Sequence, residues 1–228
     1  MILSRKTTIF LSAILIIGGA VFAKDYYVEM DKRSDLALLQ ALKDDKLGKF
    51  KKLLKSGANP NVVFGQKDWV MGLATEEGKM AYLKLAITHS GDANLNNPYS
   101  SYNRPIFLAI LNNNDEAIKY LIEKGADLDA RHCSKCAEAV QYSPASMAAT
   151  FNEYALVYYI IEKKGRLTPL ETKQLIFKIE NGLIDLKSEA NQWRIKVVNY
   201  LRAKGHTVEP KMHSRFEKKK SKRNKTKK

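Results

Sequence analysis

Apolar residues recur at steps of three and four residues through most of the chain, which places them on one face of a helix. Successive helical stretches end in similar segments that close on a glycine: FKKLLKSG at Gly57, KLAITHSG at Gly91, IKYLIEKG at Gly125, VYYIIEKKG at Gly165 and VNYLRAKG at Gly205. These glycines are 34, 34, 40 and 40 residues apart. An alanine lies 16 or 17 residues before each of the first four: Ala41, Ala74, Ala109 and Ala148. Two short helices in each period, closed by a glycine turn, predict an all-α fold of stacked helical repeats.

The period from residue 104 to 129, RPIFLAILNNNDEAIKYLIEKGADLD, resembles the ankyrin repeat. That family opens its first helix with a Thr-Pro-Leu-His box, and Pro105 stands at the proline position, where a missing N–H is harmless. Ala109 matches the alanine at the close approach of the helices, and Asn113 replaces the mid-repeat glycine. The segment Gly125-Ala126-Asp127 matches the closing motif of the family.

The resemblance extends from about Asp35 to Pro210, and the fourth period repeats the opening box as SPASMAA from Ser143. We expect the last period to lack this box. It carries the insertion ENGLIDLKSEANQ, which is typical of a divergent C-terminal cap. Residues 24–34 are expected to cap the other end. The resemblance therefore implies an ankyrin-repeat solenoid of about four repeats plus a divergent capping repeat, which together form one domain over residues 24–209.

Residues 1–23 have the order of a cleaved secretory signal peptide. Arg5 and Lys6 precede the apolar run IFLSAILII, and small residues end the segment at Val21 and Ala23. An uncleaved membrane anchor is the alternative interpretation, but the apolar segment is shorter than the ~20 residues that span a bilayer. We expect cleavage after Ala23 and export to the bacterial periplasm.

The formal net charge of +15 arises mainly at the C-terminus. Residues 210–228 contain ten Lys or Arg and one Glu, for a net charge of +9, whereas residues 24–209 carry only +4. We expect this tail to be disordered, either as a solubilising segment or in contact with anionic lipid or an acidic protein. Nucleic acid is not expected, because the signal peptide directs the chain away from chromatin and the tail has few aromatic residues.

The pair Cys133 and Cys136 has four interpretations: a thioredoxin-like redox motif, half of a zinc site completed by His132, a disulfide, or two free thiols. The redox motif belongs beside a βαβ unit, which the helical pattern does not provide. A zinc site lacks a second cysteine pair. Because export favours oxidation, the sequence favours a disulfide within an inserted loop. No metal ion or other cofactor is expected.

Catalysis has little support in the sequence, and we expect the protein not to be an enzyme. Ser143 takes the place of the family's threonine, where its hydroxyl caps a helix, and no nucleophile elbow surrounds it. The paired acids Asp44-Asp45 and Glu76-Glu77 are typical of solvated helix ends.

The resemblance implies instead that the concave face of the repeats binds another protein. We expect three aromatic residues on the loop tips, Trp69, Tyr99 and Tyr102, and an apolar stripe beside the landmark alanines, Leu108, Leu111 and Met147. Packing against neighbouring repeats is the alternative for each aromatic residue. The sequence thus predicts an exported module that binds one protein partner. Small exported ankyrin proteins are similar to immunity proteins that neutralise secreted toxins, such as type VI phospholipase effectors. The alternative function is an envelope-associated structural or stress-protection protein that its basic tail holds on anionic surfaces.

Overall fold

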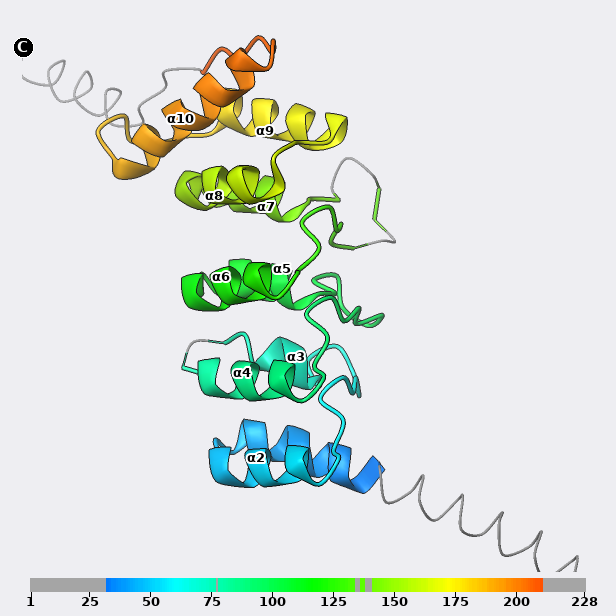
Figure 1. Ribbon diagram of the computed structural model, residues 1–228. Coiled ribbons are helices and arrows are strands. Elements are labelled where there is room, and N and C mark those ends of the chain that lie inside the picture. Colours follow the sequence, from blue (N-terminus) through cyan, green and yellow to red (C-terminus); the bar gives the residue numbers. More distant parts are fainter. Residues whose placement is uncertain (1–31, 77, 134–135, 138–140, 211–228) are drawn as a thin grey trace, which may run out of the picture. The chain divides into compact units, whose positions relative to one another are not determined.

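The computed structural model describes residues 32–76, 78–133, 136–137 and 141–210 (Figure 1). The predicted signal peptide at 1–23, most of the predicted N-terminal cap and nearly all of the basic tail lie outside the described residues. The chain divides into two compact units. Unit 1 contains described residues 32–74 and 78–92, and unit 2 contains residues 75–76 together with described residues from 93 onward.

Unit 1 consists of a helix over residues 32–43, α2 (Leu47–Lys55), α3 (Val70–Leu73) and α4 (Met80–Thr88). Its core brings α2 and α4 together, with the rings of Phe50 and Tyr82 edge to face and 5.0 Å apart. The Tyr82 hydroxyl donates to the Asp45 carboxylate over 2.9 Å. Burial and this carboxylate together raise the pKa of Tyr82 to about 12, so the phenol stays protonated at any physiological pH.

Unit 2 consists of three helix pairs, which Figure 1 shows as successive layers. They are α5 (Pro105–Leu111) with α6 (Asp115–Glu123), α7 (Pro144–Thr150) with α8 (Tyr154–Lys164), and α9 (Pro169–Asn181) with α10 (Glu189–Ala203). The first helices pack in sequence, α5 on α7 and α7 on α9, and α10 packs on α8. The described residues of both units thus contain five helix pairs, which confirms the predicted four repeats and divergent fifth.

Residues with a left-handed backbone recur within the repeats at the spacing of the sequence period. Four residues after each landmark alanine the backbone is left-handed, at Asp45, Gly78, Asn113 and Asn152. Asn and Asp tolerate this conformation better than other residues with a side chain, so Asn113 can replace a glycine. The second period departs from the pattern, because its left-handed closing residue is Ser90. Gly91 instead allows a close approach, since a Cβ there would lie 2.7 Å from the backbone of Ala86.

Helix capping explains where the first helices of unit 2 begin. Each of α5, α7 and α9 has a proline in its first turn. The Ser143 hydroxyl accepts from the Ser146 N–H over 3.3 Å, which confirms the predicted capping role of this serine. Thr168 and Glu171 form a reciprocal capping box at the start of α9.

The fifth helix pair differs from the others in its entry loop. Only three residues separate Gly165 from α9, whereas loops 94–104 and 130–143 precede α5 and α7. Both α9, with 13 residues, and α10, with 15, are longer than the helices of the earlier pairs. In the part of the chain that the structure describes, no helix combines the length and apolar character that crossing a bilayer requires.

Candidate protein-binding surface

Trp69 is buried, so the prediction that it is an exposed anchor on a loop tip is wrong. It is the N-cap residue of α3, at the position that Ser143 occupies in α7, and only 1% of its surface is exposed. Its indole lies over Gly72, where a Cβ would come within 2.1 Å of the ring. The ring therefore fills space that the glycine leaves open, and Trp69 serves the core of unit 1.

The predicted apolar stripe is interrupted at Met147, which is also buried, and this part of the prediction is wrong too. Met147 belongs to α7, which packs against α5, α8 and α9, so few residues of this helix are exposed to solvent. Leu108 of α5 is half-buried, whereas Leu111 at the end of the same helix is 41% exposed. Leu111 is thus the most accessible member of the predicted stripe.

The loop of residues 94–104 carries both predicted tyrosines and is held by its own hydrogen bonds. The Asn97 N–H donates to the Asn103 carbonyl over 2.7 Å, and the Tyr99 N–H donates to Asn97 Oδ1 over 2.9 Å. Tyr99 is 64% exposed, as expected of a loop-tip residue. Tyr102 is half-buried, because its ring stacks on that of His132 with 5.7 Å between centroids.

His132 links this loop to the loop before α7. Its ring stacks on Tyr142 at 5.4 Å as well as on Tyr102, and its Nδ1 accepts from the Tyr142 N–H over 2.8 Å. Burial lowers the pKa of His132, and the Tyr142 carbonyl, to which a charged ring would donate, offsets this only partly. The imidazole is therefore neutral at physiological pH and acts as a spacer between two phenol rings.

Cys133 and Cys136 lie at disulfide distance, with their Cα atoms 5.4 Å apart. The Cys133 N–H donates to the Ser101 carbonyl over 2.7 Å, so the cysteine loop and the 94–104 loop are joined directly. On the far side, Gln141 donates to the Cys136 carbonyl and Gln174 of α9 donates to the Gln141 carbonyl. The two loops and α9 are thus joined by a continuous hydrogen-bond network in unit 2.

A cavity of about 280 Å³ lies where the two loops meet. Its lining comes from the 94–104 loop and one cysteine: Asn96, Asn97, Pro98, Tyr99, Ser100, Ser101, Asn103 and Cys133. None of these side chains is charged at neutral pH. The side-chain Oδ1 of Asn103 is buried and has no hydrogen-bond partner within the described part of the chain.

The first helices of unit 2 expose apolar and basic side chains. Thr150, Phe177 and Lys178 line a second cavity between the ends of α7 and α9, and the Lys178 ammonium lies 5.0 Å from the centre of the Tyr142 ring. Phe177 is 61% exposed. The expectation that its period lacks the opening box is wrong, because Thr168-Pro169-Leu170 opens α9 with Thr168 as the N-cap. Without that alignment, sequence analysis missed Phe177.

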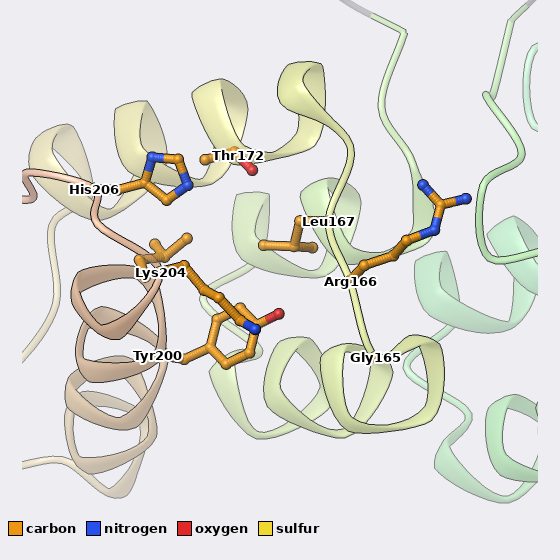
Figure 2. Close-up of a pocket in the computed structure, with 8 residues that line it drawn as sticks. Gly165, Arg166, Leu167, Thr172, Tyr200, Lys204 and His206 are labelled. Carbon is orange, nitrogen blue, oxygen red and sulfur yellow. The ribbon is translucent and has the colours of Figure 1, made fainter.

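A third cavity, of about 290 Å³, lies among α8, α9 and α10 and is lined partly by basic residues (Figure 2). Figure 2 shows the Arg166 guanidinium directed away from Lys204 and His206, with Leu167 between them. Gly165 and Lys204 follow the C-terminal ends of α8 and α10, where exposed carbonyl groups repel anions. The basic groups therefore do not converge on one anion and instead complement the helix ends.

Two buried charged side chains of unit 2, Lys164 and Glu171, form an ion-pair network with Asp129. Lys164 Nζ lies 2.5 Å from Glu171 Oε2 and 2.7 Å from Asp129 Oδ1, and Lys164 and Glu171 are both buried. Burial by itself would raise the pKa of Glu171, but hydrogen bonds from Lys164, Ser143 and the Thr168 N–H hold it below its ordinary value. These groups are paired with one another and join the end of α8 to the start of α9.

Among the residues that the structure describes, no group of three or more histidine, cysteine or acidic side chains is placed to hold a metal ion. His132, the ligand considered at the sequence level, uses its Nδ1 as an acceptor for a backbone N–H.

Comparison with known proteins relates the chain to one repeat family. The family model described as ankyrin repeats (3 copies) matches residues 38–132 and 71–171, together more than half of the chain. The crystal structure of the human ASB11 ankyrin repeat domain is similar at 16% sequence identity and a TM-score of 0.45, over 75% of this chain and 84% of that one. No curated protein matches the sequence.

Proposed function

Since the chain belongs to the ankyrin-repeat family, we propose that it is a non-catalytic module that binds one protein partner through unit 2. Repeats of this family generally mediate protein–protein interaction, and their proteins are typically non-catalytic scaffolds. The observation that carries the proposal is the exposure of large side chains, Tyr99 on a loop tip and Leu111 and Phe177 on first helices. Exposed aromatic and aliphatic side chains of this kind are typical anchors of protein interfaces.

The charge of this surface suggests an acidic partner. Helices α5 and α7 contain no charged residue, whereas α9 carries Lys173 and Lys178 on accessible positions. The acids of α9 are engaged within the protein, Glu171 with Lys164 and Glu180 with the Glu209 N–H. The accessible charge on the first helices of unit 2 is thus positive. This charge would speed the association of the protein with a partner that has an acidic surface, most strongly at low salt.

We propose that the protein works in the bacterial periplasm after cleavage of residues 1–23. The order of basic, apolar and small residues before Lys24 supports export. Cysteines at disulfide distance fit an oxidising compartment. Intact-mass measurement of the exported protein is expected to give Lys24 as the first residue, and a mature chain that still begins at Met1 would contradict cleavage.

We further propose that the partner is a secreted toxin or enzyme, which the module neutralises as an immunity protein. Analogy with small exported ankyrin proteins supports this proposal, and a phospholipase effector of type VI secretion is an example of such a toxin. The alternative is an envelope-associated structural or stress-protection role, which the charge of +9 on residues 210–228 supports.

The test begins with cross-linking and purification of the protein from its native envelope. One stoichiometric protein partner supports the binding module, and genes next to its own would identify a toxin. Association that depends on anionic lipid, with no protein partner, would support the alternative and overturn the proposal.

A second step locates the interface with the purified partner. Tyr99→Ser and Leu111→Gln together are expected to weaken affinity about a thousandfold, because each anchor contributes ~2 kcal/mol. The matched control is Ile195→Gln on α10, which removes an exposed apolar side chain from a second helix. Unchanged helicity in both proteins, with affinity lost only in the first, is expected. Equal affinities would move the interface away from the loop tips and first helices.

A further inference from the structure

We propose that the exposed face of α9 binds the same face of a second copy of this chain, so that the protein forms a weak antiparallel dimer through unit 2. The contact places Phe177 beside the two-fold axis and pairs Lys173 of each copy with Glu180 of the other. The inference goes beyond the proposed function, because Tyr99 and Leu111 lie on other elements of unit 2 and are left for a protein partner.

Helix α9 has one buried side and one side that faces solvent. On the buried side, Leu175 and Ile179 belong to the same apolar core as residues of α8 and α10. Four residues spaced by three or four form a stripe along the opposite side: Leu170, Lys173, Phe177 and Glu180. Lys173 and Phe177 are exposed, and the other two are half-buried.

The stripe lies on the last first-helix of the described repeats. The first helices of unit 2 pack in sequence, α5 on α7 and α7 on α9, and within the described residues no later first helix covers α9. A solenoid normally ends in a repeat with a polar outer face. Here the stripe has an exposed phenyl ring at its centre, and Leu183 just beyond the helix end is exposed as well. Exposed apolar groups of this size mark a surface for further packing.

The stripe is self-complementary about a point between residues 176 and 177. Lys173 lies as many residues before this point as Glu180 lies after it, and the same holds for Leu170 and Leu183. When two copies of α9 pack antiparallel about this point, each lysine faces a glutamate and each leucine faces a leucine. A two-fold interface requires such self-complementarity. A parallel arrangement would instead place like charges opposite each other.

The two charges of the stripe cannot pair with each other inside one helix. Residues seven apart are separated by about 10 Å along the helix axis, whereas ion pairs within a helix join residues three or four apart. Glu180 Oε1 accepts from the Glu209 N–H over 3.0 Å, which holds this side chain in place and leaves its negative charge. No ion pair of the described residues involves Lys173. The second copy supplies the opposite charge for both groups.

The size of the interface predicts a weak dimer. Helix α9 has 13 residues and is about 20 Å long, so its contact with one other helix is small compared with the ~1,200–2,000 Å² of stable complexes. The net charge of +15 on each chain also opposes association when salt is low. Dimers are therefore expected at micromolar or higher protein concentration, and at physiological rather than low salt.

The test is sedimentation equilibrium of the purified protein over a concentration series at physiological salt. The wild type is expected to pass from monomer to dimer. Phe177→Gln and Lys173→Glu should each weaken dimerisation about tenfold or more, because each removes a central contact from both copies. The matched control is Lys49→Glu on α2, which makes the same change of net charge at an exposed position in unit 1 and should dimerise like the wild type. Circular dichroism should show equal helicity in all four proteins.

Charge exchange tests the antiparallel pairing directly. Lys173→Glu and Glu180→Lys should each weaken self-association, because each variant places like charges opposite one another. An equal mixture of the two variants should form a heterodimer, and the protein with both changes should dimerise like the wild type. If Glu180→Lys alters the helicity, Phe177→Gln and Lys173→Glu decide the question without it.

A wild type that stays monomeric up to millimolar concentration would overturn the inference. A dimer that neither Phe177→Gln nor Lys173→Glu weakens would overturn it too, as would charge variants that fail to associate when mixed. If the protein dimerises only after removal of residues 210–228, the tail and not a second copy covers α9, and the inference is again wrong. These results leave the proposed function standing, since binding of a protein partner through Tyr99 and Leu111 is measured separately.

Discussion

At the scale of single residues, the clearest case is the pair Trp69 and Gly72. The indole occupies the volume where the glycine lacks a side chain, so the residue type at position 72 decides whether the tryptophan can be buried. The two positions are three residues apart, so one helical turn brings them together. A bulky N-cap residue followed by a glycine is the signal that could have revealed burial from the sequence.

We predict that Gly72→Ala destabilises the protein by about 1–3 kcal/mol, because the added methyl group displaces the indole or the backbone. The measurement is urea unfolding followed by circular dichroism. The matched control is Gly48→Ala in α2, where a Cβ meets no atom within 4 Å. That change should instead stabilise by about 0.5–1 kcal/mol, since alanine is the better helix former. Similar effects of the two substitutions would contradict the packing role of Gly72.

At the scale of elements, buried polar groups join pieces that are separate in the sequence pattern. Lys164 at the end of α8 pairs with Glu171 of α9 and with Asp129 of the preceding repeat. His132 and the Cys133 N–H join the loops before α5 and α7. The start of α9 is therefore held in place by ion pairs as well as by apolar packing.

The Glu171 network predicts a loss of stability in acid. The folded-state pKa of Glu171 lies below its ordinary value of 4.5, so its contribution is fully present above pH 4.5 and is lost as pH falls through the folded pKa. Glu171→Gln should lower stability by about 1–3 kcal/mol at neutral pH, the cost of a charged hydrogen bond. The difference from wild type should shrink in urea titrations below pH 4.5. A difference that stays constant with pH would show that the ionised carboxylate is not the stabilising form.

For the cysteine loop we predict that denatured, non-reduced protein contains no titratable thiol from Cys133 or Cys136. Reduction should cost at most about 2 kcal/mol, because a bond across three residues closes a very short loop. Thiol counting and thermal unfolding with and without reductant measure the two effects. Two free thiols, or stoichiometric zinc in the purified protein, would refute the disulfide.

At the scale of the whole molecule, the charge is concentrated outside the part of the chain that folds into repeats. Residues 210–228 carry +9, whereas the last buried apolar residue of the described part is Val208. The Val208 carbonyl accepts from Arg202 of α10 over 2.7 Å, so the backbone is bound to the repeat domain up to Val208.

We predict that deletion of residues 210–228 leaves the unfolding transition unchanged, because the deleted segment has few apolar residues with which to offset conformational entropy. The same deletion should weaken adhesion to anionic vesicles, most strongly at low salt, where charges are least screened. Vesicle co-sedimentation over a salt series measures this. Equal adhesion of the two proteins would leave the tail with a solubilising role only.

The sequence by itself determined the repeating helix pairs, the capping by Ser143 and the ankyrin family, because helical periodicity, caps and turns depend on neighbours a few residues away. It also indicated the exposure of Tyr99 and Leu111. The tertiary structure alone decided that Trp69 and Met147 are buried, because their surroundings come from packing rather than from position relative to a landmark alanine. Likewise, the burial of the Asn103 side chain without a partner for its Oδ1 appears only once the described loops meet, since burial and hydrogen-bond partners are properties of the assembled layers and not of one repeat.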